Sequence, residues 1–360
     1  MRRTITWIST IVTAFALAGA ASATVSEPPP LPSRAGLVEQ VNALLGYGSM
    51  SETTLRHPGA EYIKVHFSRL LLLPGDYVTV ASPDGTESHT VTRPGWAMSV
   101  TGDAVKVTLH SLATGVVGSL LGATIDKTAR GFTPAESHSS QREESVCAND
   151  DKTDAVCYKT SDPVPYRRSK AVARMLIKGT ELCTGFRVGP SNRMLTNHHC
   201  VSTSSEAADT EVWFNYQCAE CGGYAVFRTT KVWLSQIIAT DRTLDYTVFS
   251  VTDFDQVSKY GYMELDVRRP AVGERLYVPQ HPSGEPSKIA MTNCAVEDNA
   301  YEGYAPDTDI SYYCDTAGGS SGSPVLSRDT DKVVALHHFG GCPNSGVRMD
   351  RIYQQIQGLI

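Results

Sequence analysis

The chain has 360 residues, of which 41% are hydrophobic, and it carries a formal net charge of -6 at pH 7. This length is sufficient for two or three domains of about 100–200 residues each. The charge balance is mildly acidic and no block of Lys or Arg stands out, which excludes the electrostatic footprint of a nucleic-acid-binding protein. We therefore expect no nucleic-acid partner.

The first 23 residues have the pattern of a secretory signal peptide. Two arginines precede an apolar run from Ile5 to Leu17, and Ala21-Ser22-Ala23 supplies the small residues for cleavage after Ala23. A membrane anchor is the less favoured alternative, because the run is shorter than the ~20 apolar residues of a membrane span. We expect a secreted protein with no membrane partner. Export makes the nine cysteines candidates for disulfides, with at least one left over.

Two polar segments separate the chain into an N-terminal block and a larger C-terminal block. Residues 24–37 contain Pro28-Pro29-Pro30 and are typical of a linker. Over 38–112, short alternating apolar and polar runs between Pro, Gly and Asp turns predict a small antiparallel β-sandwich. Its role remains open between a propeptide that assists folding and an accessory domain that binds substrate or a cell surface.

The segment over 113–146 is expected to be a second linker that is accessible to processing. From 147 to 360 the strand and turn patterns return, with frequent Gly and aromatic residues, and a helical pattern is visible only at about 350–357. The predicted fold class is therefore all-β in both blocks.

A histidine beside a cysteine is the first candidate catalytic motif. His199 follows the apolar run Met194-Leu195-Thr196, and its imidazole could supply the general base that amide hydrolysis needs near neutral pH. A Cys183–Cys200 disulfide would hold its loop. The alternative is a zinc site made from His198, His199, Cys200, Cys218 and Cys221. Adjacent histidines on a strand point to opposite faces, so they rarely bind one metal, and we expect none.

The candidate for the residue that orients this base is Asp245. It precedes an alternating strand pattern over 246–251, where a carboxylate could accept a hydrogen bond from the imidazole and stabilise the imidazolium. Asp241 is the alternative. It lies in a polar loop before the apolar run, whereas an orienting carboxylate has to be buried and held, so Asp245 is favoured.

The most specific motif is the segment Cys314–Val325, which reads CDTAGGSSGSPV. Its glycines allow a sharp turn that exposes one hydroxyl, and the amides of Gly319 and Ser321 could point together at an oxyanion. Ser320 and Ser323 are alternative nucleophiles, but only Ser321 has glycine two residues before it and one residue after it. We therefore predict a catalytic triad of His199, Asp245 and Ser321.

The order and spacing of these three residues resemble those of the chymotrypsin-like serine peptidases. The GSSGSP motif, together with the segments 212–217, 280–282 and 336–342, is similar to the compact bacterial and fungal branch that includes lysyl and glutamyl endopeptidases. The resemblance covers about residues 147–360. It implies two six-stranded antiparallel β-barrels with the triad in the cleft between them, and hydrolysis of protein or peptide substrates without a cofactor.

The resemblance also implies a specificity pocket. Asp315 stands where trypsin-like enzymes hold the Asp that binds Lys or Arg, whereas Thr316 and His338 resemble the pair that binds acidic side chains in glutamyl endopeptidases. Cleavage after basic residues is slightly favoured over cleavage after acidic ones. Ser320 replaces the Asp on which trypsin-type zymogen activation depends, so any latency is attributed to the region 24–145 masking the cleft.

Further disulfides are expected besides Cys183–Cys200. Cys294 and Cys314 both flank strands near the pocket and form a plausible pair. The resemblance implies Cys147 with Cys342, and Cys157 with either Cys218 or Cys221. One cysteine would then remain unpaired.

Two other classes of function remain open. A catalytically silent binding protein on a peptidase scaffold is the main alternative, although loss of a triad residue is its usual mark and all three residues are present. The β-sandwich could also be an adhesive or carbohydrate-binding module with the peptidase as an accessory. We expect a monomer.

Overall fold

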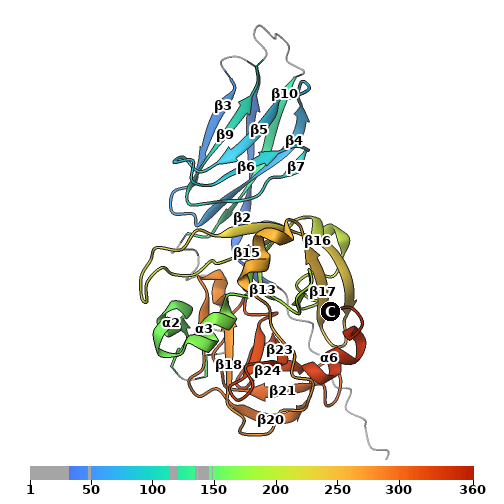
Figure 1. The fold of residues 1–360 in the computed structure, drawn as a ribbon. Helices are drawn as coiled ribbons and strands as arrows, with labels where there is room; N and C mark the ends of the chain where they lie inside the picture. Colours follow the sequence, from blue (N-terminus) through green and yellow to red (C-terminus); the bar gives the residue numbers. More distant parts are fainter. Residues whose placement is uncertain (1–31, 48–49, 113–120, 134–135, 137–145, 148) are drawn as a thin grey trace, which may run out of the picture.

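The computed structural model describes residues 32–360 apart from 48–49, 113–120, 134–135, 137–145 and 148. The described chain forms an N-terminal β-sandwich stacked on two β-barrels (Figure 1). The predicted signal peptide, residues 1–23, lies outside the described residues. Among the helices of the described part, none is both long enough and apolar enough to cross a membrane.

The N-terminal unit consists of two antiparallel sheets. One has the strand order β2-β10-β4-β7, with β8 also paired to β4, and the other has the order β3-β9-β5-β6. Their inner faces bury an apolar core that includes Val65, Phe67 and Val107, as expected for a sandwich. The strands are β2 (Gly36–Leu45), β3 (Glu52–Arg56), β4 (Tyr62–Leu71), β5 (Tyr77–Ala81), β6 (Ser88–Val91), β7 (Gly95–Trp96), β8 (Val100–Thr101), β9 (Ala104–His110) and β10 (Gly122–Gly131).

The sandwich extends beyond both of its predicted boundaries. Strand β10 lies within the segment 113–146 that was expected to be a linker, and it pairs with both β2 and β4. Strand β2 begins at Gly36, inside the first expected linker. The signal of β10 is weak because its fully buried apolar side chains are only Ala123, Ile125 and Ala129, between polar residues. The prediction that residues 122–131 belong to a linker is therefore wrong.

The first barrel is a closed ring of six antiparallel strands. The order is β13-β12-β15-β16-β17-β14, and β14 pairs back to β13 to close the ring. A short strand, β1 (Ser33–Arg34), is added to the free part of the β13 edge. The barrel strands are β12 (Val172–Ile177), β13 (Glu181–Arg187), β14 (Met194–Thr196), β15 (Thr210–Phe214), β16 (Thr230–Asp241) and β17 (Tyr246–Val251).

The second barrel has the strand order β18-β22-β23-β24-β21-β20. Hydrogen bonds from Leu276 N to the Cys294 carbonyl (2.8 Å) and from Val296 N to the Glu274 carbonyl (3.0 Å) join its two ends. The strands are β18 (Leu276–Gln280), β20 (Val296–Tyr301), β21 (Asp309–Tyr312), β22 (Pro324–Ser327), β23 (Val333–Phe339) and β24 (Asn344–Arg348), with β19 (Lys288–Ala290) and β11 (Thr153–Asp154) beside β18.

The helices are short and lie at the margins of the barrels. The predicted C-terminal helix is confirmed as α6, which packs against β23 and β24. Together the two rings confirm the predicted chymotrypsin-like architecture of paired six-stranded barrels. The helices are α2 (Tyr158–Ser161), α3 (Pro163–Ser169), α4 (Ser204–Ala208), α5 (Phe254–Val257) and α6 (Met349–Ile356), with single 3-10 turns at 155–157, 258–260 and 282–284.

A buried charge network joins the sandwich to the first barrel. Lys64 of β4 pairs with Glu211 of β15 at 2.8 Å, and the side chains of both are fully buried. Ser99 adds hydrogen bonds from its backbone amide (3.0 Å) and its hydroxyl (2.6 Å) to the Glu211 carboxylate. Lys231 of β16 reaches back to Glu87 of the sandwich at 2.6 Å. These contacts place four charged side chains, two from each unit, in the interface between the sandwich and the first barrel.

The structure contains four disulfides. Both pairs predicted from the residues are present, as are the pair of Cys147 with Cys342 and a bond from Cys157 to Cys221. Cys218 is left as a buried free thiol, so of the two alternatives for Cys157 the structure selects Cys221. The confirmed predicted pairs are Cys183–Cys200 and Cys294–Cys314.

Candidate active site

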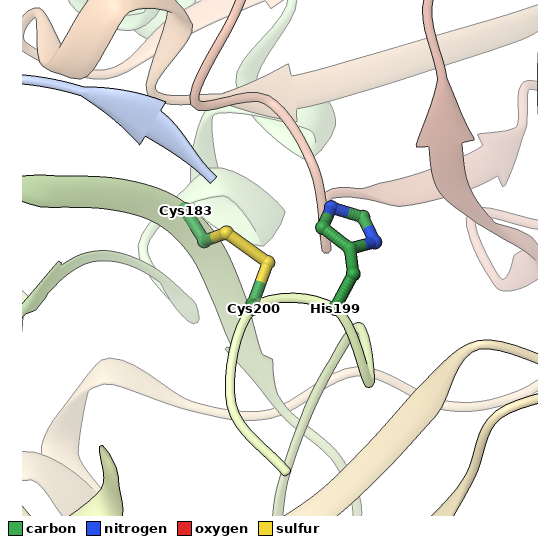
Figure 2. A group of neighbouring side chains, drawn as sticks. All are labelled: Cys183, His199 and Cys200. Carbon is green, nitrogen blue, oxygen red and sulfur yellow. A yellow bond between two sulfur atoms is a disulfide. The ribbon is translucent and has the colours of Figure 1, made fainter. Parts of the chain in front are cut away.

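His199 lies in the loop after β14, which the Cys183–Cys200 disulfide ties to β13 (Figure 2). Asp245 contacts this loop twice. Its Oδ1 accepts a hydrogen bond from the His199 backbone amide at 2.9 Å, and its Oδ2 lies 2.7 Å from His199 Nδ1. One carboxylate therefore fixes both the backbone and the ring of the predicted base.

Asp245 occupies the tight turn between β16 and β17. Its φ of 41° is in the left-handed region, and only 1% of the residue is exposed. The alternative carboxylate, Asp241, instead accepts a hydrogen bond from the Leu244 amide at 2.7 Å and so stabilises the same turn. The buried carboxylate that contacts the histidine is thus the predicted one.

The Asp245 carboxyl is held in its ionised form. Burial alone would raise its pKa, but the charges and hydrogen bonds of His199 and His338 outweigh burial and lower the pKa well below its usual range. An ionised carboxylate only accepts hydrogen bonds, so Nδ1 of His199 carries the proton. His199 Nε2 is then an acceptor, and it is buried without a hydrogen-bond partner among the described residues.

The loop before β22 exposes one of its three candidate hydroxyls. Ser320 Oγ donates to Gln280 Oε1 at 2.5 Å and accepts from the Ala317 amide at 3.1 Å. Ser323 Oγ donates to the Ser320 carbonyl at 2.5 Å. Both of these serines are fully buried, whereas Ser321 is partly exposed. The geometry therefore leaves Ser321 as the hydroxyl that is open to a substrate.

Two glycines shape this loop. Gly319 and Gly322 have φ values of 93° and 87°, which side-chain-bearing residues rarely adopt. A Cβ on Gly322 would also overlap the Thr184 carbonyl. The backbone amides of Gly319 and Ser321 donate to no backbone carbonyl in the described part of the chain. These two amides are the predicted oxyanion donors, and they remain available for that role.

Strand β13 of the first barrel holds the serine loop of the second. The Thr184 amide donates to the Ser321 carbonyl at 2.8 Å, and Thr184 Oγ1 donates to the Gly319 carbonyl at 2.9 Å. Cys200, which directly follows His199, has its sulfur 4.0 Å from the same Ser321 carbonyl. The loops that carry the three predicted triad residues therefore meet at one place between the barrels.

His338, the third predicted specificity residue, contacts Asp245 of the candidate triad. Its Nδ1 is 3.2 Å from Asp245 Oδ2 and its Nε2 is 2.6 Å from Asp309 Oδ2. Burial lowers the pKa of His338, but the charge of Asp309 and the hydrogen bonds to both carboxylates raise it to about 9. The ring is therefore an imidazolium that donates to two carboxylates.

His338 lies at an irregularity of β23. His337 is opposite Gly346 and Phe339 is opposite Ser345 on β24, so His338 is the extra residue between these two pairs. His337 Nδ1 lies 2.7 Å from the Tyr312 hydroxyl, and burial lowers the pKa of His337 to about 3, which leaves it neutral. The sequence did not show which of the two histidines would turn toward Asp245.

The other two predicted pocket residues lie together on the segment after β21. Asp315 is 5% exposed, and its carboxylate accepts a hydrogen bond from the Asp151 amide at 2.8 Å. Thr316 Oγ1 donates to Asn344 Oδ1 at 2.9 Å. Neither residue contacts His338 in the hydrogen bonds of the described residues. Their part in selecting a side chain stays a prediction.

The alternative of a zinc site is wrong. Potential ligand atoms of Cys183, His199 and Cys200 do lie within 4.8 Å of one another. However, the two sulfurs are joined in a disulfide (Figure 2), and Cys221 is also disulfide-bonded. A disulfide provides no thiolate, which is the form of cysteine that binds zinc.

Three functional neighbours were not found by sequence reasoning. Asp309 holds the His338 imidazolium, Thr184 holds the serine loop, and Asn344 orients Thr316. Asp309 and Asn344 lie outside the motifs, and Thr184, next to Cys183, was assigned no role. All three are in strands whose sequence pattern indicates only burial. Their contacts cross between strands that are distant in sequence, so no local signal could have identified them.

Comparison with known proteins agrees with this architecture. The trypsin-like peptidase domain family matches residues 183–336. The Secreted RxLR effector protein 73 of Plasmopara viticola is 33% identical over 331 residues, which is 83% of this chain and 79% of that protein. A structure of a Glu endopeptidase in complex with MPD is 18% identical, with a TM-score of 0.45, and covers 59% of this chain and 97% of its own.

A structure of the HtrA-type protease AlgW with a tripeptide is 15% identical, with a TM-score of 0.43, and covers 55% of this chain and 62% of its own. The relationship to the effector protein is closer and spans most of both chains. The chain therefore belongs to the same family as this secreted effector protein, and it contains a trypsin-like peptidase domain with the chymotrypsin-type fold.

Proposed function

We propose that the chain is a secreted serine endopeptidase whose triad is His199, Asp245 and Ser321. The observation that carries this proposal is the state of the imidazole. Asp245 holds its Nδ1 at 2.7 Å, while its Nε2 is buried and lacks a partner among the described residues. A buried acceptor without a donor is costly, and a catalytic role would explain why it is kept. The Ser321 hydroxyl lies on the adjoining loop but makes no hydrogen bond with Nε2 in this structure.

The reaction would proceed through an acyl-enzyme. Ser321 Oγ attacks the peptide carbonyl carbon while His199 Nε2 takes the hydroxyl proton. The free amides of Gly319 and Ser321 donate to the oxyanion of the tetrahedral intermediate. His199 then gives its proton to the leaving amine. Water repeats the sequence on the acyl-enzyme, with His199 again acting as the base, and releases the acid.

Cleavage after Lys or Arg is the specificity that we propose. Asp315, six residues before Ser321, offers a buried carboxylate, and a carboxylate can pair with a cationic side chain. The acid-binding alternative required Thr316 to act together with His338. Since His338 is occupied by two carboxylates, one member of that pair is not free to bind a substrate.

We further propose that the sandwich is an accessory domain that stays with the peptidase, rather than a propeptide that leaves. The fully buried Lys64–Glu211 pair and the Lys231–Glu87 pair cross the interface. Separation would leave apolar and charged groups exposed together on both units. The four disulfides and the secreted relative support an extracellular location for the whole chain.

The first test uses the purified protein and its Ser321→Ala variant. A fluorophosphonate probe should label the wild type, and cleavage sites in a denatured protein, mapped by mass spectrometry, should follow Lys or Arg. Ser321→Ala should abolish both signals, and Ser323→Ala is the matched control that should keep the label. A folded wild type that neither reacts with the probe nor cuts any of several proteins would favour the catalytically silent scaffold.

The orienting carboxylate gives a second test. Asp245→Asn should lower kcat by about 10⁴-fold, because an amide cannot hold the same imidazole tautomer. Asp241→Asn is the matched control on the same turn and should retain activity, since Asp241 contacts the Leu244 amide and not His199. Equal losses in both variants would show that the turn, rather than the Asp245 charge, supports the reaction.

A further inference from the structure

The short strand β1 shares one strand edge with the catalytic serine loop. Ser33 is opposite Leu182 and Arg34 is opposite Glu181 on β13, and the Ala35 amide donates to the Thr180 carbonyl at 2.7 Å. Further along the same edge, the Thr184 amide donates to the Ser321 carbonyl at 2.8 Å. Residues two apart on a strand are separated by about 7 Å, so Ser33 lies next to the candidate nucleophile loop.

The Ser33 side chain also faces the serine loop directly. A Cβ built on Gly318 would come within 2.6 Å of Ser33 Oγ. Gly318 precedes Gly319, whose amide is a proposed oxyanion donor. Ser33 is therefore enclosed between β13 on one side and the loop that carries Ser321 on the other.

The sandwich fixes this strand in place. Strand β2 begins at Gly36, directly after Ala35, and the Phe132 amide, which follows β10, donates to the Ala35 carbonyl at 2.8 Å. A Cβ at Gly36 would overlap the Arg130 carbonyl, so the chain passes close against β10 here. Because the sandwich is docked by the buried charge network, β1 is positioned by an entire domain and not only by its own two residues.

The occupied edge lies on the side of the cleft toward which the leaving group departs. The leaving amine has to reach His199, and His199 is linked to β13 through the neighbouring Cys183–Cys200 disulfide. The proposed specificity residue Asp315 lies instead on the second barrel. A substrate chain that continues beyond the scissile bond would extend along β13 as an added antiparallel strand. The backbone groups of Glu181 and Leu182 that it would use already pair with β1.

We propose that Ser33 and Arg34 take the place of the substrate chain beyond the scissile bond, so that the endopeptidase is slower on substrates that continue beyond that bond than on substrates with a short leaving group. This inference rests on the proposed peptidase function. Substrates whose chain ends soon after the scissile bond fit without displacing β1. Longer substrates bind only when they displace β1 from the edge.

The register of β1 provides a matched pair of variants. Alternate residues of a strand direct their amides to the same side, so the Ser33 amide faces β13, as the Ala35 amide does, and the Arg34 amide faces away. Ser33→Pro removes an amide that faces β13, whereas Arg34→Pro removes one that faces away. A third variant lacks residues 24–34 and starts at Ala35 after the signal peptide.

Two substrates with the same acyl residues separate the effects. One carries a small chromogenic amine after the scissile bond, and the other continues for four amino acids. We expect Ser33→Pro and the deletion to raise kcat/KM about tenfold for the long substrate, from the backbone hydrogen bonds released for it, and to leave the short substrate unchanged. Arg34→Pro should behave like the wild type with both substrates.

Binding provides a readout that does not need catalysis. In the Ser321→Ala background, Ser33→Pro should tighten the binding of the long peptide, as measured by calorimetry, and Arg34→Pro should not. Unchanged kcat/KM and affinity for the long peptide, or an equal rise for both substrates, would overturn the inference while the peptidase function stands. Absence of probe labelling and of short-substrate hydrolysis in the folded wild type and in every variant, with no change in affinity, would overturn both.

Discussion

Replacing His338 with glutamine is expected to move the acidic limb of the kcat/KM–pH profile to higher pH. The variant keeps a side chain that can donate a hydrogen bond but removes the positive charge next to Asp245. The acidic limb reports protonation of the catalytic base, for which we propose His199. In the wild type the His338 cation opposes that protonation by repulsion. Without the cation, His199 holds its proton to higher pH and the fraction of active enzyme falls earlier on acidification.

The size of this shift follows from the shared carboxylate oxygen. His338 Nδ1 and His199 Nδ1 lie 3.2 and 2.7 Å from the same Asp245 oxygen. Two unit charges about 6 Å apart interact by about 3 kcal/mol at an effective dielectric constant of about 20, which corresponds to about two pH units. We therefore expect a shift of about one to two units.

Two other titratable groups near His338, His337 and Tyr304, are uncharged. His337 is neutral because burial lowers its pKa to about 3, and Tyr304, which packs edge-on against His338, is neutral because burial raises its pKa. His337→Gln is therefore the matched control, since it changes a neighbouring buried histidine without changing a charge. The assay is kcat/KM for a short chromogenic substrate from pH 4 to pH 10, with circular dichroism to confirm folding.

The reasoning is refuted if the acidic limb of His338→Gln coincides with that of the wild type or moves to lower pH. It is also refuted if His337→Gln produces the same shift, because the effect would then come from repacking of β23 and not from charge. A fall in kcat without movement of the limb would indicate that His338 only holds the position of Asp245.

Three stability predictions follow from the same structure. Lys64→Met should lower the free energy of unfolding by about 3–5 kcal/mol in urea titrations, because its buried carboxylate partner loses its cation, whereas Lys106→Met, at an exposed pair, should cost less than about 1 kcal/mol. Burial lowers the pKa of His281 to about 3, so the unfolded state binds more protons than the folded state below pH ~6.5. The free energy of unfolding should therefore fall as the pH is lowered from ~6.5 to 3. In thermal unfolding, the His281→Phe variant should lose less stability over this range than the wild type. Replacing Cys183 and Cys200 together with alanine should cost about 3 kcal/mol in urea titrations, given their sequence separation of 17.

The features that could be predicted from the sequence depend on residues that are close together in the chain. The serine loop could be recognised because glycine is required at Gly319 and Gly322, where φ is 93° and 87°. The Cys183–Cys200 disulfide was inferred because export makes cysteines pair and a hairpin brings these two together. Asp245 was preferred to Asp241 because of its expected burial. In the structure Asp245 is 1% exposed and contacts His199.

The features that could not be predicted depend on contacts between residues that are distant in the sequence. His338 and His337 are neighbours in sequence, but they differ in charge because His338 hydrogen-bonds two carboxylates whereas His337 hydrogen-bonds the Tyr312 hydroxyl. Strand β10 was not predicted because it lies between β2 and β4, and its pairing with both strands stabilises it. It can therefore contain alanine and threonine at positions where we would otherwise expect larger apolar residues. Local propensity carries no information about such neighbours.

A continuous series of contacts links the sandwich, the first barrel and the serine loop. The sandwich is anchored on β15 through Glu211, and β15 pairs with β12, which pairs with β13. Strand β13 holds the Ser321 carbonyl through Thr184 and pairs with β1, which the sandwich itself delivers. The sandwich thus reaches the candidate nucleophile by two routes, one through the barrel and one along its own N-terminal strand. Cleavage of the chain between β10 and β11 would leave both series of contacts intact, because neither includes that segment.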